Sequence, residues 1–226
     1  MSGYVDYMSS RITALFLVCS VAGVAHAQSA QAILSRAVTA YKGAETIQAH
    51  FQQTLANPLT GTTNTTQGEL FRRRPNLLAI VFSAPLTDRI VEDGTSLWLY
   101  LPSSVPGQVI KMAANKADGM LLDPLGQILS LPSSYQYTLT DAGTAAVGGR
   151  ATHAITLTPK NDGTLFTKAT LWVDDTTGTV RQIETTEPSG LTRRIVITHV
   201  TTNRPIPHST FTFTPPANAH VVDRTP

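Results

Sequence analysis

The sequence predicts a β-rich α+β protein built on one large antiparallel sheet. About ten or eleven short runs rich in β-branched and aromatic residues are separated by turn residues such as Gly148-Gly149, Asn161-Asp162-Gly163 and Pro188-Ser189-Gly190. Two segments, one near the N-terminus and one in the middle of the chain, instead carry apolar residues at helical spacing. So many strands favour a large curled sheet, and the two helices are expected to cover its open side.

The first 27 residues have the pattern of a secretory signal peptide. Arg11 precedes an apolar run that ends in Ala25-His26-Ala27, a small-x-small cleavage signature, so the mature chain is expected to begin at Gln28. Met8 is an alternative start, because it gives a more ordinary positive segment without Asp6. The apolar run, about 14 residues, is shorter than the roughly 20 that a permanent membrane-spanning helix needs.

The mature chain is expected to form a single domain over residues 28–226. Its charge and cysteine content exclude several classes of partner and chemistry. Removing Met1–Ala27 takes away one base and one acid, so 17 and 15 become 16 and 14 and the net charge stays +2. This balance gives no electrostatic reason to expect nucleic acid or an anionic membrane surface as partner. Cys19 is the only cysteine and leaves with the signal, which excludes disulfides and thiol chemistry.

The first helix is predicted over residues 29–43, with Ser29 as N-cap and Gly43 as the stop signal. Its apolar residues fall at i, i+3, i+4, i+7, i+8 and i+11, and they are Ala30, Ile33, Leu34, Ala37, Val38 and Tyr41. This stripe either packs on the sheet to complete the core or forms a lid over a cavity. The sequence leaves both interpretations open.

Alternating apolar and polar residues predict a strand from Thr46 to about Leu55, followed by a loop rich in Thr, Gly and Asn over residues 57–66. A meander of strands then runs from Gln67 to Pro102, with breaks at Arg74-Pro75-Asn76, Ala84-Pro85 and Asp93-Gly94. One face of this meander is predicted to be half-buried, and it carries Leu78, Ile80, Phe82, Ile90, Leu97 and Leu99.

Three consecutive arginines end the first strand of the meander. Period-two alternation places Arg72 and Arg74 on one face with Leu70, and Arg73 on the other face with Phe71. One of these arginines is therefore expected to point toward an apolar face. The run is either a solvated strand end that guards against edge pairing or a functional feature.

A second, short helix is predicted around Asp123-Pro124, a pair typical of an N-cap and first turn, and it ends before Pro132. Its apolar cluster consists of Leu121, Leu122, Leu125, Ile128 and Leu129. Five more strands are predicted after it, over residues 135–140, 152–158, 165–173, 180–186 and 193–200.

No catalytic or metal-binding motif occurs in the sequence. The mature histidines are scattered, with no i, i+4 pair and no acidic partner at ligand spacing: His50, His153, His199, His208 and His220. Asp174-Asp175 falls at a turn, where carboxylates are expected to bond to nearby backbone. We therefore expect neither an enzyme nor a bound metal or cofactor.

Several motifs in order resemble the outer-membrane lipoprotein carrier proteins, the LolA family. They are Gly68-Glu69-Leu70-Phe71 leading to Arg74-Pro75-Asn76-Leu77, then Asp93-Gly94-Thr95-Ser96-Leu97-Trp98-Leu99-Tyr100, Gln108-Val109, and Phe211-Thr212-Phe213-Thr214-Pro215-Pro216. The resemblance covers nearly all of the mature chain. It implies an incomplete, half-open antiparallel β-barrel of about 11 strands covered by a helical lid.

The resemblance also implies a function. Proteins of this family are periplasmic carriers that bind the acyl chains of lipoproteins released by an inner-membrane ABC transporter and deliver them to an outer-membrane receptor. Such a carrier hydrolyses nothing itself, and it is expected to be a monomer. Because each exposed methylene costs about 0.8 kcal/mol, leaving one long acyl chain in water costs on the order of 10 kcal/mol, which is why a carrier needs an apolar hollow.

Site residues follow from the same resemblance. The arginine before Pro-Asn, here Arg74, latches the helical lid, since a guanidinium can bind the unpaired carbonyls at a helix end. The expected lining of the acyl-chain cavity is Ile33, Leu34, Leu78, Ile80, Phe82, Ile90, Leu97, Leu99, Leu125, Ile128 and Leu129. One departure concerns Leu78-Ala79-Ile80, where family members commonly carry Phe and Trp, so the shape of the hollow is left open.

Other classes of protein remain as alternatives. A periplasmic barrel that binds a small hydrophobic ligand would share the exported, β-rich chain, but it needs neither an arginine latch nor two covering helices. A membrane-anchored receptor of the same fold would need a lipid-accepting cysteine at the mature N-terminus, which Cys19 does not provide. A hydrolase ranks last, because no catalytic constellation supports it.

Overall fold

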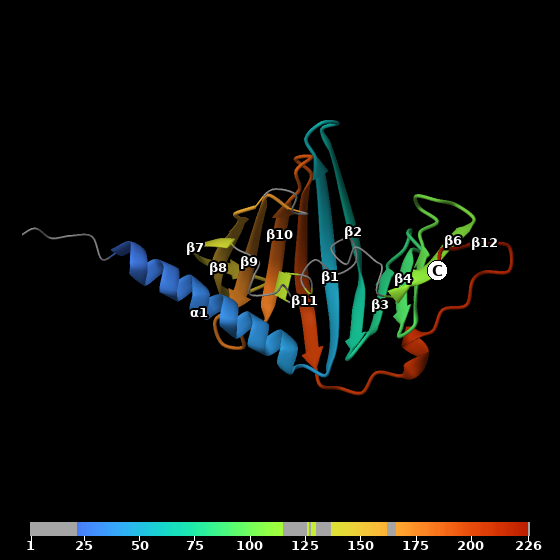
Figure 1. Cartoon of the computed structure of the whole chain (residues 1–226), viewed down its shortest axis with the longest axis horizontal. Helices are drawn as coiled ribbons and strands as arrows, with labels where there is room; N and C mark the ends of the chain where they lie inside the picture. Colours follow the sequence, from blue (N-terminus) through green and yellow to red (C-terminus); the bar gives the residue numbers. More distant parts are fainter. Residues whose placement is uncertain (1–21, 115–125, 127, 130–136, 162–165, 226) are drawn as a thin grey trace, which may run out of the picture.

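One open sheet of twelve strands forms the body of the protein. The computed structural model describes residues 22–114, 126, 128–129, 137–161 and 166–225. The strand order is β12-β6-β5-β4-β3-β2-β1-β11-β10-β9-β8-β7, and all neighbours are antiparallel except β12 and β6. Helix α1 (Ala22–Gly43) crosses one face of the sheet over its later strands (Figure 1). The ends of the sheet, β12 and β7, do not pair with each other, so the predicted half-open, β-rich architecture is confirmed.

The strands follow the chain in two consecutive groups. The first group is β1 (Thr46–Asn57), β2 (Thr62–Arg73), β3 (Leu77–Phe82), β4 (Arg89–Asp93), β5 (Ser96–Tyr100) and β6 (Gln108–Ala113). The second group is β7 (Tyr137–Val147), β8 (Arg150–Pro159), β9 (Lys168–Asp174), β10 (Val180–Thr186) and β11 (Thr192–Thr202). The chain ends with the 3-10 helix η2 (His208–Phe211) and β12 (His220–Asp223), neither of which the sequence predicted.

The prediction of a loop over residues 57–66 is wrong for most of these residues. Residues 62–66 belong to β2, whose ladder with β1 begins at the pair Asn57 and Thr62 and runs to Thr46 and Arg73. The β-branched threonines that suggested a loop are good strand formers once a partner strand supplies the hydrogen bonds. Only residues 58–61 connect the two strands, and this long hairpin extends beyond its neighbours (Figure 1).

Helix α1 is longer than predicted. It begins at Ala22 and passes through Ser29, so the prediction that Ser29 is the N-cap is wrong. Four of the seven residues before Ser29 are helix-forming alanine or glutamine, which lets the helix continue toward the N-terminus. The helix ends at Gly43 as predicted. Among the described residues, no helix combines the length and hydrophobicity needed to cross a bilayer.

The two faces of the sheet carry separate apolar clusters. On the face covered by α1, buried residues of α1, β8, β9 and β10 form the largest cluster, which includes Ile155, Leu157 and Leu171. A second cluster of Leu78, Ile80, Ile90 and Leu97 continues it on the meander. On the opposite face, buried Phe211 of η2 packs with Ala79, Val91 and Ile206.

The motif Phe211-Thr212-Phe213-Thr214-Pro215-Pro216 and the three consecutive arginines of β2 and its end lie on these two faces as the sequence predicted for the arginines. Phe211 is fully buried beneath the guanidinium of Arg73, whose Cζ lies 5.2 Å from the ring centroid. Phe213 packs on Trp98, with the ring centroids 5.9 Å apart. Arg73 therefore lies on the face opposite that of Arg72 and Leu70, as the period-two alternation predicted.

Candidate functional site

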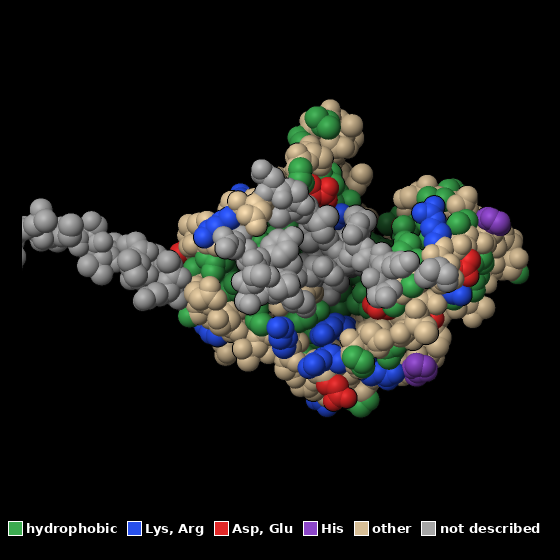
Figure 2. Space-filling view, in the orientation of Figure 1, with side chains coloured by type: hydrophobic (Ala, Val, Ile, Leu, Met, Phe, Trp, Pro, Cys, Tyr) green, Lys and Arg blue, Asp and Glu red, His purple; other side chains and the backbone are tan. Residues whose placement is uncertain are grey.

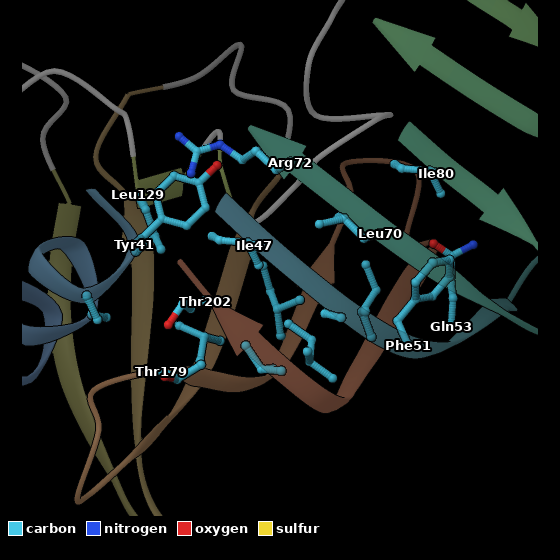
Figure 3. Close-up of a pocket in the computed structure, with 18 of the residues that line it drawn as sticks. Tyr41, Ile47, Phe51, Gln53, Leu70, Arg72, Ile80, Leu129, Thr179 and Thr202 are labelled. Atoms are coloured by element: carbon cyan, nitrogen blue, oxygen red, sulfur yellow. The ribbon is translucent and has the colours of Figure 1, made fainter. Parts of the chain in front are cut away.

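An apolar pocket of about 140 Å³ lies between the C-terminal half of α1 and the sheet (Figure 3). Its walls come from α1, from β1 to β4, from β10 and β11, and from Leu129. The lining residues are Ala37, Ala40, Tyr41, Ile47, Ala49, Phe51, Gln53, Leu70, Arg72, Ile80, Phe82, Ile90, Leu129, Thr179, Val180, Ile183, Arg193, Ile195, Ile197, Val200 and Thr202. Most of this surface is aliphatic or aromatic, which suits an apolar ligand.

The face of the sheet that α1 covers also carries apolar side chains at the molecular surface. Hydrophobic side chains are visible across this face in the space-filling view (Figure 2). Lysine and arginine side chains gather along the lower margin of this region. The apolar surface is therefore bordered by cationic side chains on the face that α1 covers.

Small residues create the empty space in the pocket. Ala37 and Ala40 lie on α1 where a larger side chain would fill the gap, and Ala49 faces them from β1. Gly68 has a related role, because a Cβ there would lie 2.8 Å from Cζ of Phe51 and 2.5 Å from the Val81 carbonyl oxygen. Only glycine allows this close approach, so Gly68 sets the position of the Phe51 ring that lines the pocket.

Polar side chains mark the two ends of the pocket. Arg72 lies over the Tyr41 ring at one end, with its Cζ 4.2 Å from the ring centroid. Gln53 lies at the other end beside Phe51 (Figure 3), and its Oε1 accepts a hydrogen bond of 3.1 Å from Arg193 Nη1. Burial lowers the pKa of Arg193, and the nearby Glu187 carboxylate partly counters this shift.

An acidic side chain lies on the same face a short way along the sheet. Glu92 of β4 pairs with Leu78 on one side and Leu97 on the other, both buried residues of the meander cluster. Burial, followed by repulsion from Asp93, raises the pKa of Glu92 above its ordinary value. The apolar face of the meander therefore contains a carboxyl group that favours its neutral form more than usual.

The residues expected to line an acyl-chain cavity are distributed over two regions. Ile80, Phe82, Ile90 and Leu129 line the pocket. Leu78, Leu97 and Leu99 belong to the adjacent meander cluster, and Ile33, Leu34 and Ile128 pack in the core between α1 and the later strands. Leu125 lies outside the described residues. A role of these residues in binding remains a prediction.

Several lining residues were not singled out from the sequence. Ile195 and Ile197 of β11 have the period-two spacing that could have identified them, as do Ile47 and Phe51 of β1. The position of Arg72 on the face of Leu70 was expected, but its place at the end of a pocket was not. What the sequence lacked was the pairing of β11 with β1, which brings strands far apart in the chain together.

Arg74, the expected latch, bonds to the end of α1. Its Nη1 donates a hydrogen bond of 2.6 Å to the Lys42 carbonyl oxygen, and its backbone N–H donates to the Glu45 carbonyl oxygen at 3.0 Å. The last carbonyls of a helix have no partner within the helix, so the guanidinium caps one of them. Arg74 thus connects the end of β2 to the helix that covers the pocket.

Comparison with known proteins identifies the family. The model for the outer membrane lipoprotein carrier protein LolA matches residues 42–214. The chain belongs to the LolA family.

Similar proteins extend this match over most of the chain. A protein of Haemophilus influenzae named outer-membrane lipoprotein carrier protein is 29% identical over 185 residues, which are 80% of this chain and 82% of that protein. A protein of the same name from Pseudomonas putida is 25% identical over 215 residues, covering 94% and 99%. An uncharacterized conserved protein from Thermus thermophilus shares the fold, with a TM-score of 0.56, 14% identity and coverage of 87% and 100%.

Membership in the LolA family also decides the class of activity. LolA proteins are carriers without enzymatic activity, so the expectation that this protein is not an enzyme is confirmed. Among the described residues, no group of three or more histidine, cysteine, aspartate or glutamate side chains could hold a metal ion. The pocket thus lies in a protein of a carrier family.

Proposed function

We propose that this LolA-family protein carries lipoproteins through the periplasm, taking them up as an inner-membrane ABC transporter releases them and delivering them to an outer-membrane receptor. The observation that carries the proposal is the apolar pocket between α1 and the open sheet. The name of its relatives, outer-membrane lipoprotein carrier protein, supports the choice of cargo. The predicted signal peptide, cleaved before Gln28, would bring the chain to the periplasm.

Loading requires the pocket to open. Its volume of about 140 Å³ is close to that of an engineered protein cavity of about 150 Å³ that holds a benzene molecule. A long acyl chain is several times larger, so α1 must move away from the sheet to admit it. Opening exposes apolar surface to water, and the closed form therefore dominates until an acyl chain replaces that contact.

Arg74 is the proposed latch for this movement. Its hydrogen bond to the Lys42 carbonyl oxygen is an exposed connection between the end of β2 and the end of α1. A bond of this kind contributes little to the stability of the whole protein but opposes the separation of the two elements that it joins. The residues proposed to meet the acyl chain are Ile33, Leu34, Leu78, Ile80, Phe82, Ile90, Leu97, Leu99, Leu125, Ile128 and Leu129.

The test is a release experiment with the mature chain from Gln28. Spheroplasts of the source organism are incubated with the protein, and acylated lipoproteins in the soluble fraction are captured together with it. Release that requires both this protein and ATP is the expected result. If no lipoprotein appears while a small apolar ligand binds well, the protein is instead a periplasmic small hydrophobic-ligand-binding barrel.

The latch is tested in the same assay with Arg74→Leu. Without the bond to Lys42 the open form is more populated, so the balance between loading and handover should change several-fold, while the free energy of unfolding changes by less than about 1 kcal/mol. Arg89→Leu, which removes an exposed arginine on β4, is the matched control and should leave transfer unchanged. Equal effects of the two variants would exclude the latch.

A further inference from the structure

Arg72 is the polar group of the pocket that the carrier role leaves unexplained. It lies on β2 in register with Ile47 of β1 and Leu78 of β3, so its side chain projects from the same face as the apolar lining. Its guanidinium lies over the Tyr41 ring, with Cζ 4.2 Å from the ring centroid (Figure 3). A cation has thus been placed among aliphatic and aromatic side chains.

Within the described part of the chain, the buried Nη1 of Arg72 has no hydrogen-bond acceptor. The two arginines that follow it in the chain, and Arg193 of the pocket, differ in this respect. Arg73 contacts the Ile206 carbonyl and His208, Arg74 donates to the Lys42 carbonyl, and Arg193 donates to Gln53. A buried charged donor without an acceptor is unfavourable, and such an arrangement in a binding pocket points to a ligand that supplies the acceptor.

No described residue on the same face of the sheet forms an ion pair with this cation. The nearest acid along the same row of the sheet is Glu92, which pairs with Leu78 on the strand beyond it. None of the ion pairs among the described residues joins Arg72 to a carboxylate. Burial, followed by repulsion from Asp93, raises the pKa of Glu92 above its ordinary value.

We propose that Arg72 binds an oxygen acceptor at the head of an acyl chain, either a carboxylate or an ester carbonyl, and so fixes the direction of the chain in the pocket. This inference rests on the proposed carrier function. The head group lies beside Arg72 and Tyr41, and the hydrocarbon runs along β1 past Ala49 and Phe51 toward Gln53.

The dimensions of the pocket agree with this direction. From Ile47, the neighbour of Arg72, to Gln53 at the opposite end are six residues of strand, or about 20 Å. A bilayer core of about 30 Å contains two layers of acyl chains, so one chain spans about 15 Å. Once α1 has moved away from the sheet, an acyl chain that begins at Arg72 can therefore lie along β1 toward Gln53.

The experiment compares three ligands of equal chain length. Hexadecanoic acid, its methyl ester and hexadecane displace a neutral apolar dye, N-phenyl-1-naphthylamine, from the wild-type protein and from Arg72→Met. The variant keeps the apolar stem and should weaken binding of the oxygen-bearing ligands about tenfold or more relative to hexadecane. If Arg72→Met weakens binding of the acid alone, the acceptor is a carboxylate. If it weakens binding of both the acid and the methyl ester, an ester carbonyl is a sufficient acceptor.

Two further variants separate binding from folding. Arg72→Lys keeps a donor and a charge and should recover part of the lost affinity. Arg73→Met removes the neighbouring arginine on the opposite face, and the ratio of affinities among the three ligands should remain as in the wild type. Hexadecanoic acid should also raise the unfolding midpoint of the wild type more than that of Arg72→Met.

The outcomes distinguish this inference from the proposed function. If Arg72→Met changes binding of all three ligands by the same factor, or of none, Arg72 does not bind the head group while the carrier function stands. If no ligand displaces the dye from the wild type, both the acyl-chain pocket and the role of Arg72 are overturned.

Discussion

Strands β7–β9 and strands β1–β5 both carry apolar side chains on the face that α1 covers, but these side chains are buried to different extents. In the packed half, β7–β9, Ile155, Leu171 and Val173 are completely buried. In the hollow half, β1–β5, Phe51 and Leu70 are only partly buried and line the pocket. One continuous sheet therefore has a closed core at one end and a space for ligand toward its middle.

One acid in each half has a shifted pKa, and the two shifts have opposite directions. Burial alone would raise the pKa of Asp174 in the packed half, but hydrogen bonds from Arg150, from the backbone of Thr177 and Thr176, and from Arg181 hold it well below its ordinary value. In the hollow half the pKa of Glu92 is raised. The hydrogen bonds of Asp174 therefore stabilise its charged form, whereas the surroundings of Glu92 favour its neutral form.

The largest effect is expected from removing a core side chain of the packed half. Leu171→Ala leaves a cavity among fully buried neighbours and should lower the free energy of unfolding by about 2–5 kcal/mol. Leu70→Ala, the matched change in the hollow half, borders existing space and should cost about 1–2 kcal/mol. Denaturant unfolding of the two variants measures the difference, and equal losses would show that the halves are packed alike.

A smaller effect is expected from Asp174→Asn, which removes the charge that Arg150 and Arg181 contact. The expected loss at neutral pH is about 1–3 kcal/mol. Because the pKa of Asp174 is lowered on folding, its contribution is present above its ordinary value of 3.8 and is lost as the pH falls through the folded value. Unfolding free energies from about pH 7 to about pH 2 should therefore converge for wild type and variant. A constant difference across this range would contradict the assignment.

The smallest effect, of opposite sign, is expected from Glu92→Gln. Since the pKa of Glu92 is raised on folding, its contribution is fully present below its ordinary value of 4.5 and is lost as the pH rises through the folded value. The glutamine variant should consequently be more stable than the wild type at neutral pH, by about 1 kcal/mol or less for this partly exposed group. The same unfolding measurements at acidic pH should show no such gain. A variant that is less stable at neutral pH would argue that Glu92 has a favourable partner in its charged form.

Much of the local organisation was predictable from the sequence. The alternation of Leu78 and Ile80 with Ala79 assigned these residues to opposite faces, and the structure places the first two in the meander cluster and Ala79 beneath Phe211. The same reasoning separated Arg72 from Arg73. These predictions succeed because the side-chain period of a strand is fixed by backbone geometry, whatever the strand pairs with.

Boundaries and partners were less predictable. The start of α1 and the length of β2 were misjudged because Ser29 and the threonines after residue 61 have local preferences that tertiary pairing overrides. The 3-10 helix and β12 gave no periodic signal, since each contains only four residues.

The sequence by itself determined the class of fold, the faces of most strands and the family. Only the tertiary structure decided where the empty space lies. The pocket exists because β11 pairs with β1, so that Ile197 and Phe51 become neighbours, and because the small residues of α1 stop short of that surface. A repeating pattern reports which way a side chain points, but the distance between two surfaces depends on contacts between residues far apart in the chain.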